Sequence, residues 1–131
     1  MISRFRLLAA VAGIATALAA TSAVAGKADY VFEPVAAEVK NGSGSQLAVR
    51  LIHKPTGKPV QGAVIFRTRL DMSPDAMGEM TAKLTPQPPN EPGIYRFSAD
   101  LSMAGRWALK LMAKVPGESE TVEGTVIFKA K

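Results

Sequence analysis

The sequence predicts an all-β fold: an immunoglobulin-like antiparallel β-sandwich of about seven strands, preceded by an N-terminal signal peptide. Three observations lead to this fold class. Short segments alternate apolar and polar residues with a period of two, which is the pattern of half-buried strands. Proline and glycine interrupt these segments at short, regular intervals, as turns do. No segment after residue 25 shows the periodicity of an amphipathic helix.

The first 25 residues have the features of a signal peptide. Arg4 and Arg6 supply a short basic start, an apolar stretch rich in leucine and alanine follows, and a small-x-small motif ends at Ala25. Cleavage after Ala25 would leave a single domain, residues 26–131. An uncleaved anchor is the alternative, although the stretch is rich in alanine and threonine for a membrane span. Either way, the domain is expected in the periplasm.

The predicted strands follow one another along this domain. The first covers residues 30–39 and a short one covers 80–84; the others show strict alternation and lie at 46–53, 63–70, 94–101, 106–113 and 121–128. Each alternating strand has one apolar face. On the strand 106–113, this face carries Trp107, which is expected to fill the core. These apolar faces are Leu47, Val49 and Leu51; Val64, Phe66, Thr68 and Leu70; Tyr95, Phe97, Ala99 and Leu101; Trp107, Leu109 and Leu111; and Val122, Val126 and Phe128.

Composition argues against several classes of function. The formal net charge is +5 at pH 7, but lysine and arginine are scattered among acids, whereas a nucleic-acid-binding face needs clustered cations. The chain has no cysteine, so it has neither a disulfide nor a thiolate site. His53 is the single histidine, which is too few for catalytic zinc, and no serine lies in a nucleophile elbow. We therefore expect no nucleic-acid binding and no enzymatic activity.

Half of the six methionines lie close together, at Met72, Met77 and Met80. Pro74 and the uneven spacing of these residues exclude a regular strand across the whole segment, so a loop between strands is expected. Thioether sulfur is a soft, neutral ligand that suits Cu(I) or Ag(I). The segment is therefore a candidate metal site.

Strand direction adds a fourth methionine to this candidate site. If successive strands alternate in direction, the loop after 63–70 and the loop after 94–101 emerge at the same end of the sandwich, and the second loop contains Met103. By the same argument, His53 leads into a loop at the opposite end. The alternative is structural, because methionine fills irregular gaps in cores and forms adaptable docking surfaces.

Two stretches, "TGKPVQGAVIFRTRLDMSPDAMGEM" and "PGIYRFSADLSMAGRWALKLMAKV", resemble the small periplasmic domains grouped as YtkA-like or FixH-like. The shared features are a Gly-Lys-Pro-Val turn, a methionine-bearing loop, a Pro-Gly-x-Tyr entry to a strand and a Met-Ala-Gly-x-Trp turn. The resemblance covers residues 47–128 and implies an immunoglobulin-like sandwich. Family members occur beside heavy-metal efflux and copper-handling machinery and in the assembly of copper oxidases. FixH proteins proper keep a membrane anchor, whereas this N-terminus looks cleavable.

The resemblance implies a copper role in which Met72, Met77 and Met80 supply ligands and Met103 closes the site. We therefore predict a periplasmic accessory protein in copper or heavy-metal handling that binds Cu(I) or Ag(I), with Asp71 and Asp75 attracting cations without ligating them. The alternative is a non-catalytic module that docks a membrane efflux or oxidase-assembly complex through the same end without binding metal. The sequence does not define an oligomeric state.

Overall fold

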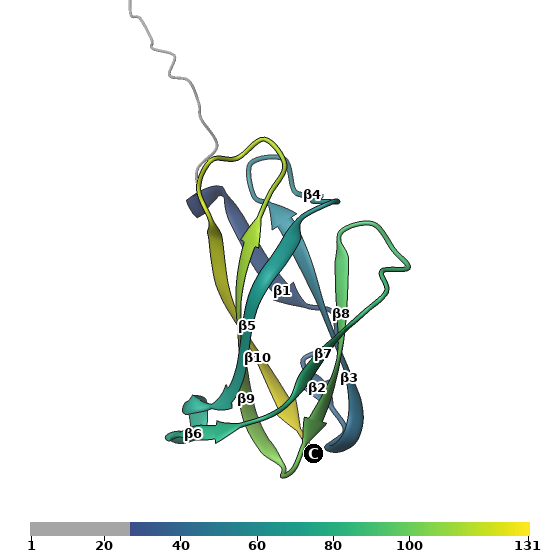
Figure 1. Ribbon diagram of the computed structural model, residues 1–131, viewed down its shortest axis with the longest axis vertical. Coiled ribbons are helices and arrows are strands. Elements are labelled where there is room, and N and C mark those ends of the chain that lie inside the picture. The colour runs from purple at the N-terminus through teal and green to yellow at the C-terminus, as the bar shows by residue number, and fades with distance from the viewer. Residues whose placement is uncertain (1–26) are drawn as a thin grey trace, which may run out of the picture.

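The structure, a computed structural model, describes residues 27–131 as two β-sheets packed face to face (Figure 1). The predicted signal peptide, residues 1–25, lies outside the described residues. Two short 3₁₀ helices and ten strands follow one another along the chain: η1 (Lys27–Asp29), β1 (Tyr30–Pro34), β2 (Glu38–Val39), β3 (Gly42–His53), β4 (Lys58–Pro59), β5 (Val64–Met72), η2 (Ser73–Asp75), β6 (Met77–Thr81), β7 (Leu84–Gln87), β8 (Ile94–Leu101), β9 (Gly105–Lys114) and β10 (Val122–Ala130).

The strands divide between the sheets in the manner of an immunoglobulin-like sandwich. One sheet has the order β1-β3-β8-β7, with β4 paired to β3, and the other has the order β2-β10-β9-β5-β6. Neighbouring strands are antiparallel, except that the short β2 runs parallel to β10. Within residues 27–131, no helix is long and apolar enough to cross a membrane. The predicted fold class is confirmed.

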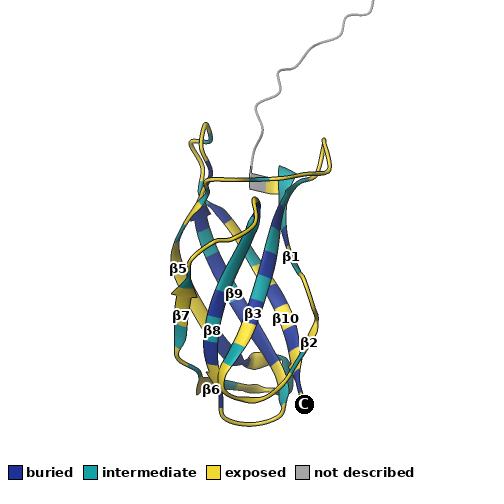
Figure 2. Ribbon diagram, turned by 90° about the vertical axis from the view of Figure 1, so that its right-hand side faces the viewer, coloured by how far each residue is buried: buried dark blue, intermediate teal, exposed yellow. Residues whose placement is uncertain are grey.

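The core lies between the two sheets, and most of it comes from the predicted apolar faces (Figure 2). Trp107 is fully buried, as expected, and its indole N–H donates a hydrogen bond to the Met103 carbonyl. Because successive residues of a strand point to opposite sides of a sheet, alternation in the sequence becomes alternation of burial. The confirmed inward residues are Leu47, Val49, Leu51, Leu70, Phe97, Ala99, Leu101, Trp107, Leu109, Leu111, Val122, Val126 and Phe128.

Two predicted strands are each divided between the sheets. The segment 30–39 forms β1 in one sheet and β2 in the other, and the chain around residues 80–84 forms β6 and then β7 in the opposite sheet. With the added pairing of β4, the described chain therefore has ten strands where about seven were expected. A strand that changes sheets satisfies backbone groups in both layers, and local alternation alone does not reveal the change.

The predicted inward face of β5 is wrong at its first half. A register shift between Ile65 and Arg67 marks a β-bulge in the pairing with β9, and a bulge adds one residue that breaks the alternation. Ile65, which pairs with the buried Ala113, is therefore part of the core side, whereas Val64 and Phe66 are 61% and 51% exposed.

Candidate metal site at one end of the sandwich

The methionine-bearing segment is a tight hairpin and not one continuous loop. Met72 ends β5, η2 makes the turn, and Met77 and Met80 lie on β6. Pro74 occupies the first turn of η2, where a missing N–H has no cost, and Ala76 closes the turn with a left-handed φ of 62°. Met72 and Met77 are cross-strand partners, so the hairpin brings two of the four predicted methionines side by side.

The hairpin is fastened to the start of β9 by one carboxylate. Asp75 accepts hydrogen bonds from the Arg106 backbone N–H at 2.8 Å and from Arg106 Nε at 2.8 Å, and Arg106 Nη2 donates to the Pro74 carbonyl at 2.7 Å. These bonds, first from the backbone and then from the side chain of Arg106, lower the pKa of Asp75. The predicted meeting of the two loops at one end is therefore confirmed, and it is visible at the lower end of Figure 1.

Met103 reaches this end from the β8–β9 turn. Its carbonyl is held by the Trp107 indole at 3.2 Å, and Gly105, two residues later, packs against the hairpin. A Cβ at Gly105 would lie 2.5 Å from Met72 Cε and 2.7 Å from Asp75 Oδ2. We call the group Met72, Met77, Met80 and Met103 the methionine end.

The four methionines differ in burial. Met72 is 0% exposed and belongs to the hydrophobic core, whereas Met77, Met80 and Met103 are 36%, 39% and 37% exposed. The structural alternative from the sequence, methionine as a core filler, therefore applies to Met72. The other three thioethers remain accessible to an ion or to a partner protein.

The two nearby aspartates are engaged in structural contacts. Asp71 is 1% exposed and accepts bonds from Arg69 Nε at 2.7 Å, Lys110 Nζ at 3.1 Å and the Ser73 N–H at 3.0 Å. Burial alone would raise the pKa of Asp71, but the bonds from Ser73, Arg69 and Lys110 outweigh it and hold this pKa well below its ordinary value. The expectation that Asp71 and Asp75 attract cations is corrected, since arginine and lysine already neutralise them.

His53 lies at the opposite end, as its position in the sequence predicted. Its Nδ1 is hydrogen-bonded to Thr56 Oγ1 at 2.9 Å, and its ring contacts that of Tyr30. Among the described residues, no group of three or more histidine, aspartate or glutamate side chains is arranged to hold a metal ion. The candidate metal site predicted from the sequence is the methionine end.

Sequence reasoning found the methionines but missed the contacts that hold them in place. Arg106, Gly105 and the buried carboxylate of Asp71 set the geometry of this end. The Met-Ala-Gly turn before Trp107 was a local signal for Gly105. No local signal links Asp75 to Arg106, because the two residues are 31 positions apart.

The comparisons with known proteins identify the family. A sequence model of the YtkA-like family matches residues 24–112, so the chain belongs to the YtkA-like family. The resemblance to FixH-like proteins stays a prediction. A search of curated proteins found no match.

Two solved structures are similar to this chain. One is the crystal structure of the Lin-41 filamin domain, with 19% identity over 77% of this chain and 94% of that chain and a TM-score of 0.42. The other is the ZirS C-terminal domain, with 13% identity over 95% of this chain and 87% of that chain and a TM-score of 0.43.

Proposed function

We propose that this protein is a periplasmic, non-catalytic accessory protein in copper or heavy-metal handling that carries Cu(I) or Ag(I) on its methionine end. The observation that supports the proposal is the position of four methionines, from two separate turns, at one end of the sandwich, three of them exposed by about a third. Thioethers favour soft monovalent ions over hard cations. The resemblance to domains found beside copper-handling machinery points to the same cargo.

Thioether sulfur is the type of donor that such an ion prefers. Met77, Met80 and Met103 would bind from the exposed side, and Met72 lies on the interior side next to Met77 and Gly105. The two carboxylates are occupied by Arg69, Lys110 and Arg106, so the binding energy would come from sulfur. Because neutral thioethers need no deprotonation, binding should change little with pH.

The surroundings preorganise this end. Asp75 joins η2 to β9, and Asp71 joins the end of β5 to Lys110 on β9. Ligands held by such supporting contacts lose less conformational freedom on binding than ligands on a free loop. The proposed carrier therefore has a rigid hairpin under its sulfur atoms.

The test is a competition titration of the purified protein with Cu(I) and a chelator of known affinity. A variant with Met77, Met80 and Met103 all changed to leucine should lose binding and remain folded, because leucine replaces methionine at nearly constant volume. Met112→Leu, on the outer side of β9, is the matched control and should bind as the wild type does.

Two outcomes would overturn the copper proposal: no stoichiometric binding by a folded wild-type protein, or unchanged binding by the triple variant. If the protein binds no metal but a membrane efflux or oxidase-assembly protein binds it through the same three methionines, the docking alternative replaces the carrier. The exposed methionines suit that role as well, since flexible thioether side chains adapt to many partners.

A further inference from the structure

The first part of β5 has an open edge. On one side, β5 pairs with β9 from Val64 to Asp71; on the other side, β6 pairs only with Asp71 and Met72. The chain then leaves for β7, which belongs to the opposite sheet. Residues 64–69 therefore present one edge without a partner strand, over a length of about 20 Å.

Backbone hydrogen bonding shows which groups face this edge. The Leu70 carbonyl accepts a bond from the Ala82 N–H at 3.0 Å, so Leu70 directs its backbone groups away from β9. Alternate residues of a strand direct their N–H and C=O groups to the same side. Thr68, two residues earlier and exposed, therefore turns its N–H and C=O to the open edge.

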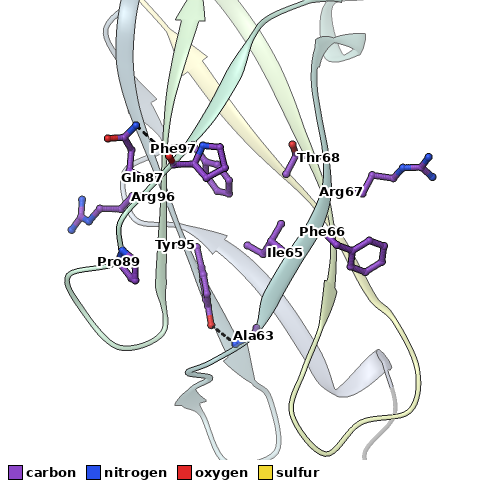
Figure 3. A pocket seen from close by; sticks show the side chains of 11 residues that line it. Ala63, Ile65, Phe66, Arg67, Thr68, Gln87, Pro89, Tyr95, Arg96 and Phe97 are labelled. Carbon is purple, nitrogen blue, oxygen red and sulfur yellow. Dashed lines mark hydrogen bonds between the residues drawn. The ribbon is translucent and has the colours of Figure 1, made fainter.

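A cleft of about 350 Å³ lies beneath this edge, between β5 of one sheet and β7 and β8 of the other (Figure 3). Ile65 and Thr68 point into the cleft from β5, whereas Phe66 and Arg67 point to the outer side of the sheet. The walls are mostly apolar, with Pro86, Pro89, Tyr95 and Phe97 across from Ile65.

The Tyr95 hydroxyl, a polar group in the cleft wall, already has both of its hydrogen-bond partners. The Tyr95 hydroxyl donates to the Val60 carbonyl at 2.7 Å and accepts from the Ala63 N–H at 3.0 Å. An apolar side chain therefore suits the cleft better than a polar one. Across the cleft, β7 is short and contains Pro86, which has no N–H to donate, so β5 offers the more complete edge for pairing.

The charges near this edge favour an acidic partner segment over a second copy of the chain. Arg67 and Arg96 are the charged residues that line the cleft, and no acid is among them. The Arg96 side chain is bound to Asn90 and Glu91, whereas the Arg67 side chain has no hydrogen bond or ion pair within residues 27–131. If a second copy paired antiparallel about Thr68, Arg67 of each copy would face Arg69 of the other, and like charges directly opposite are destabilising.

We propose that the open edge of β5 binds an extended segment of a partner protein by strand addition, with an apolar side chain in the cleft and an acidic side chain on the outer face beside Arg67. Main-chain hydrogen bonds would supply affinity and alternate side chains would supply specificity. This surface is separate from the methionine end, and the proposal does not depend on metal binding.

The test begins with a display library of random linear peptides, selected on the purified protein. Enriched sequences should alternate apolar and acidic residues. The best synthetic peptide should protect the Thr68 amide from hydrogen exchange and shift the NMR signals of residues 64–69 and of the cleft. Thr68→Pro removes the open-edge donor, as proline does at exposed strand edges without breaking the sheet, and should weaken peptide binding about ten-fold.

A charge-matched pair supplies the second arm. Arg67→Glu should weaken the peptide about five-fold or more, since it places like charges opposite one another, whereas Lys129→Glu, exposed on β10, should leave the affinity unchanged. This arm decides the question if Thr68→Pro fails to fold. The proposal is overturned if no peptide is enriched, if enriched peptides bind Arg67→Glu as tightly as the wild type, or if the signals map to another surface. Sedimentation that shows self-association lost on Thr68→Pro would make the occupant a second copy and refute an acidic partner.

Discussion

Substituting Gly105 should destabilise the fold and the methionine end together. Gly105 has a φ of +139°, and an added Cβ would lie 2.5 Å from Met72 Cε and 2.7 Å from Asp75 Oδ2. The backbone strain costs about 1–3 kcal/mol, the forced repacking of Met72 about 1–3 kcal/mol, and a lost bond from the Arg106 N–H to Asp75 about 1 kcal/mol. Gly105→Ala should therefore lower the free energy of unfolding by about 3–7 kcal/mol.

Gly42→Ala separates the two causes. Gly42 has a similar φ of +128°, but a Cβ there would meet nothing within 4 Å. This variant should lose only the strain energy, about 1–3 kcal/mol. Urea unfolding and thermal melts of both variants supply the assay, and Gly105→Ala should melt about 10 °C or more below Gly42→Ala in a domain of this size. Equal destabilisation of the two variants would refute the packing that we assign to Gly105, Met72 and Asp75.

Two further predictions concern ionisable groups. Asp71→Asn should cost about 1–3 kcal/mol of unfolding free energy near neutral pH, since it breaks two ion pairs at a buried position. The folded pKa of Asp71 lies below its ordinary value of 3.8. The difference in unfolding free energy between the wild type and Asp71→Asn is therefore complete above that value and declines in acid. The gap between wild type and variant in urea unfolding should narrow from about pH 5 to about pH 3, and a constant gap would contradict the assignment. Burial first, and then Glu118, raise the pKa of Tyr30 to about 12. Glu118→Gln should therefore lower the pKa of one of the two tyrosines, measured by absorbance, and leave that of Tyr95 unchanged. Two unchanged tyrosine pKa values would rule out the contact between Tyr30 and Glu118.

The long central strands could be predicted from the sequence because each shows the period-two alternation within its own residues. In β8, β9 and β10, the alternation of apolar and polar residues corresponds directly to buried and exposed faces. Phe97, Trp107 and Phe128 are the buried examples, one on each strand. The shared end of the β5–β6 hairpin and the Met103 turn could also be predicted, because alternating strand direction is a rule of topology. Which methionine is buried could not, since burial of Met72 depends on contacts with Gly105 and the rest of the core.

Sequence by itself determined the sandwich, its turns, the apolar faces of the central strands and the absence of cysteine ligands, because these follow from composition and a period of two residues. Only the tertiary structure decided the bulge that turns Phe66 outward, the change of sheet between β6 and β7, and the ion pairs that occupy Asp71 and Asp75. Most of these features depend on residues far apart in the chain, as Arg106 is from Asp75 and Lys110 is from Asp71. A local pattern specifies which way a side chain alternates, but only the folded chain specifies what it meets.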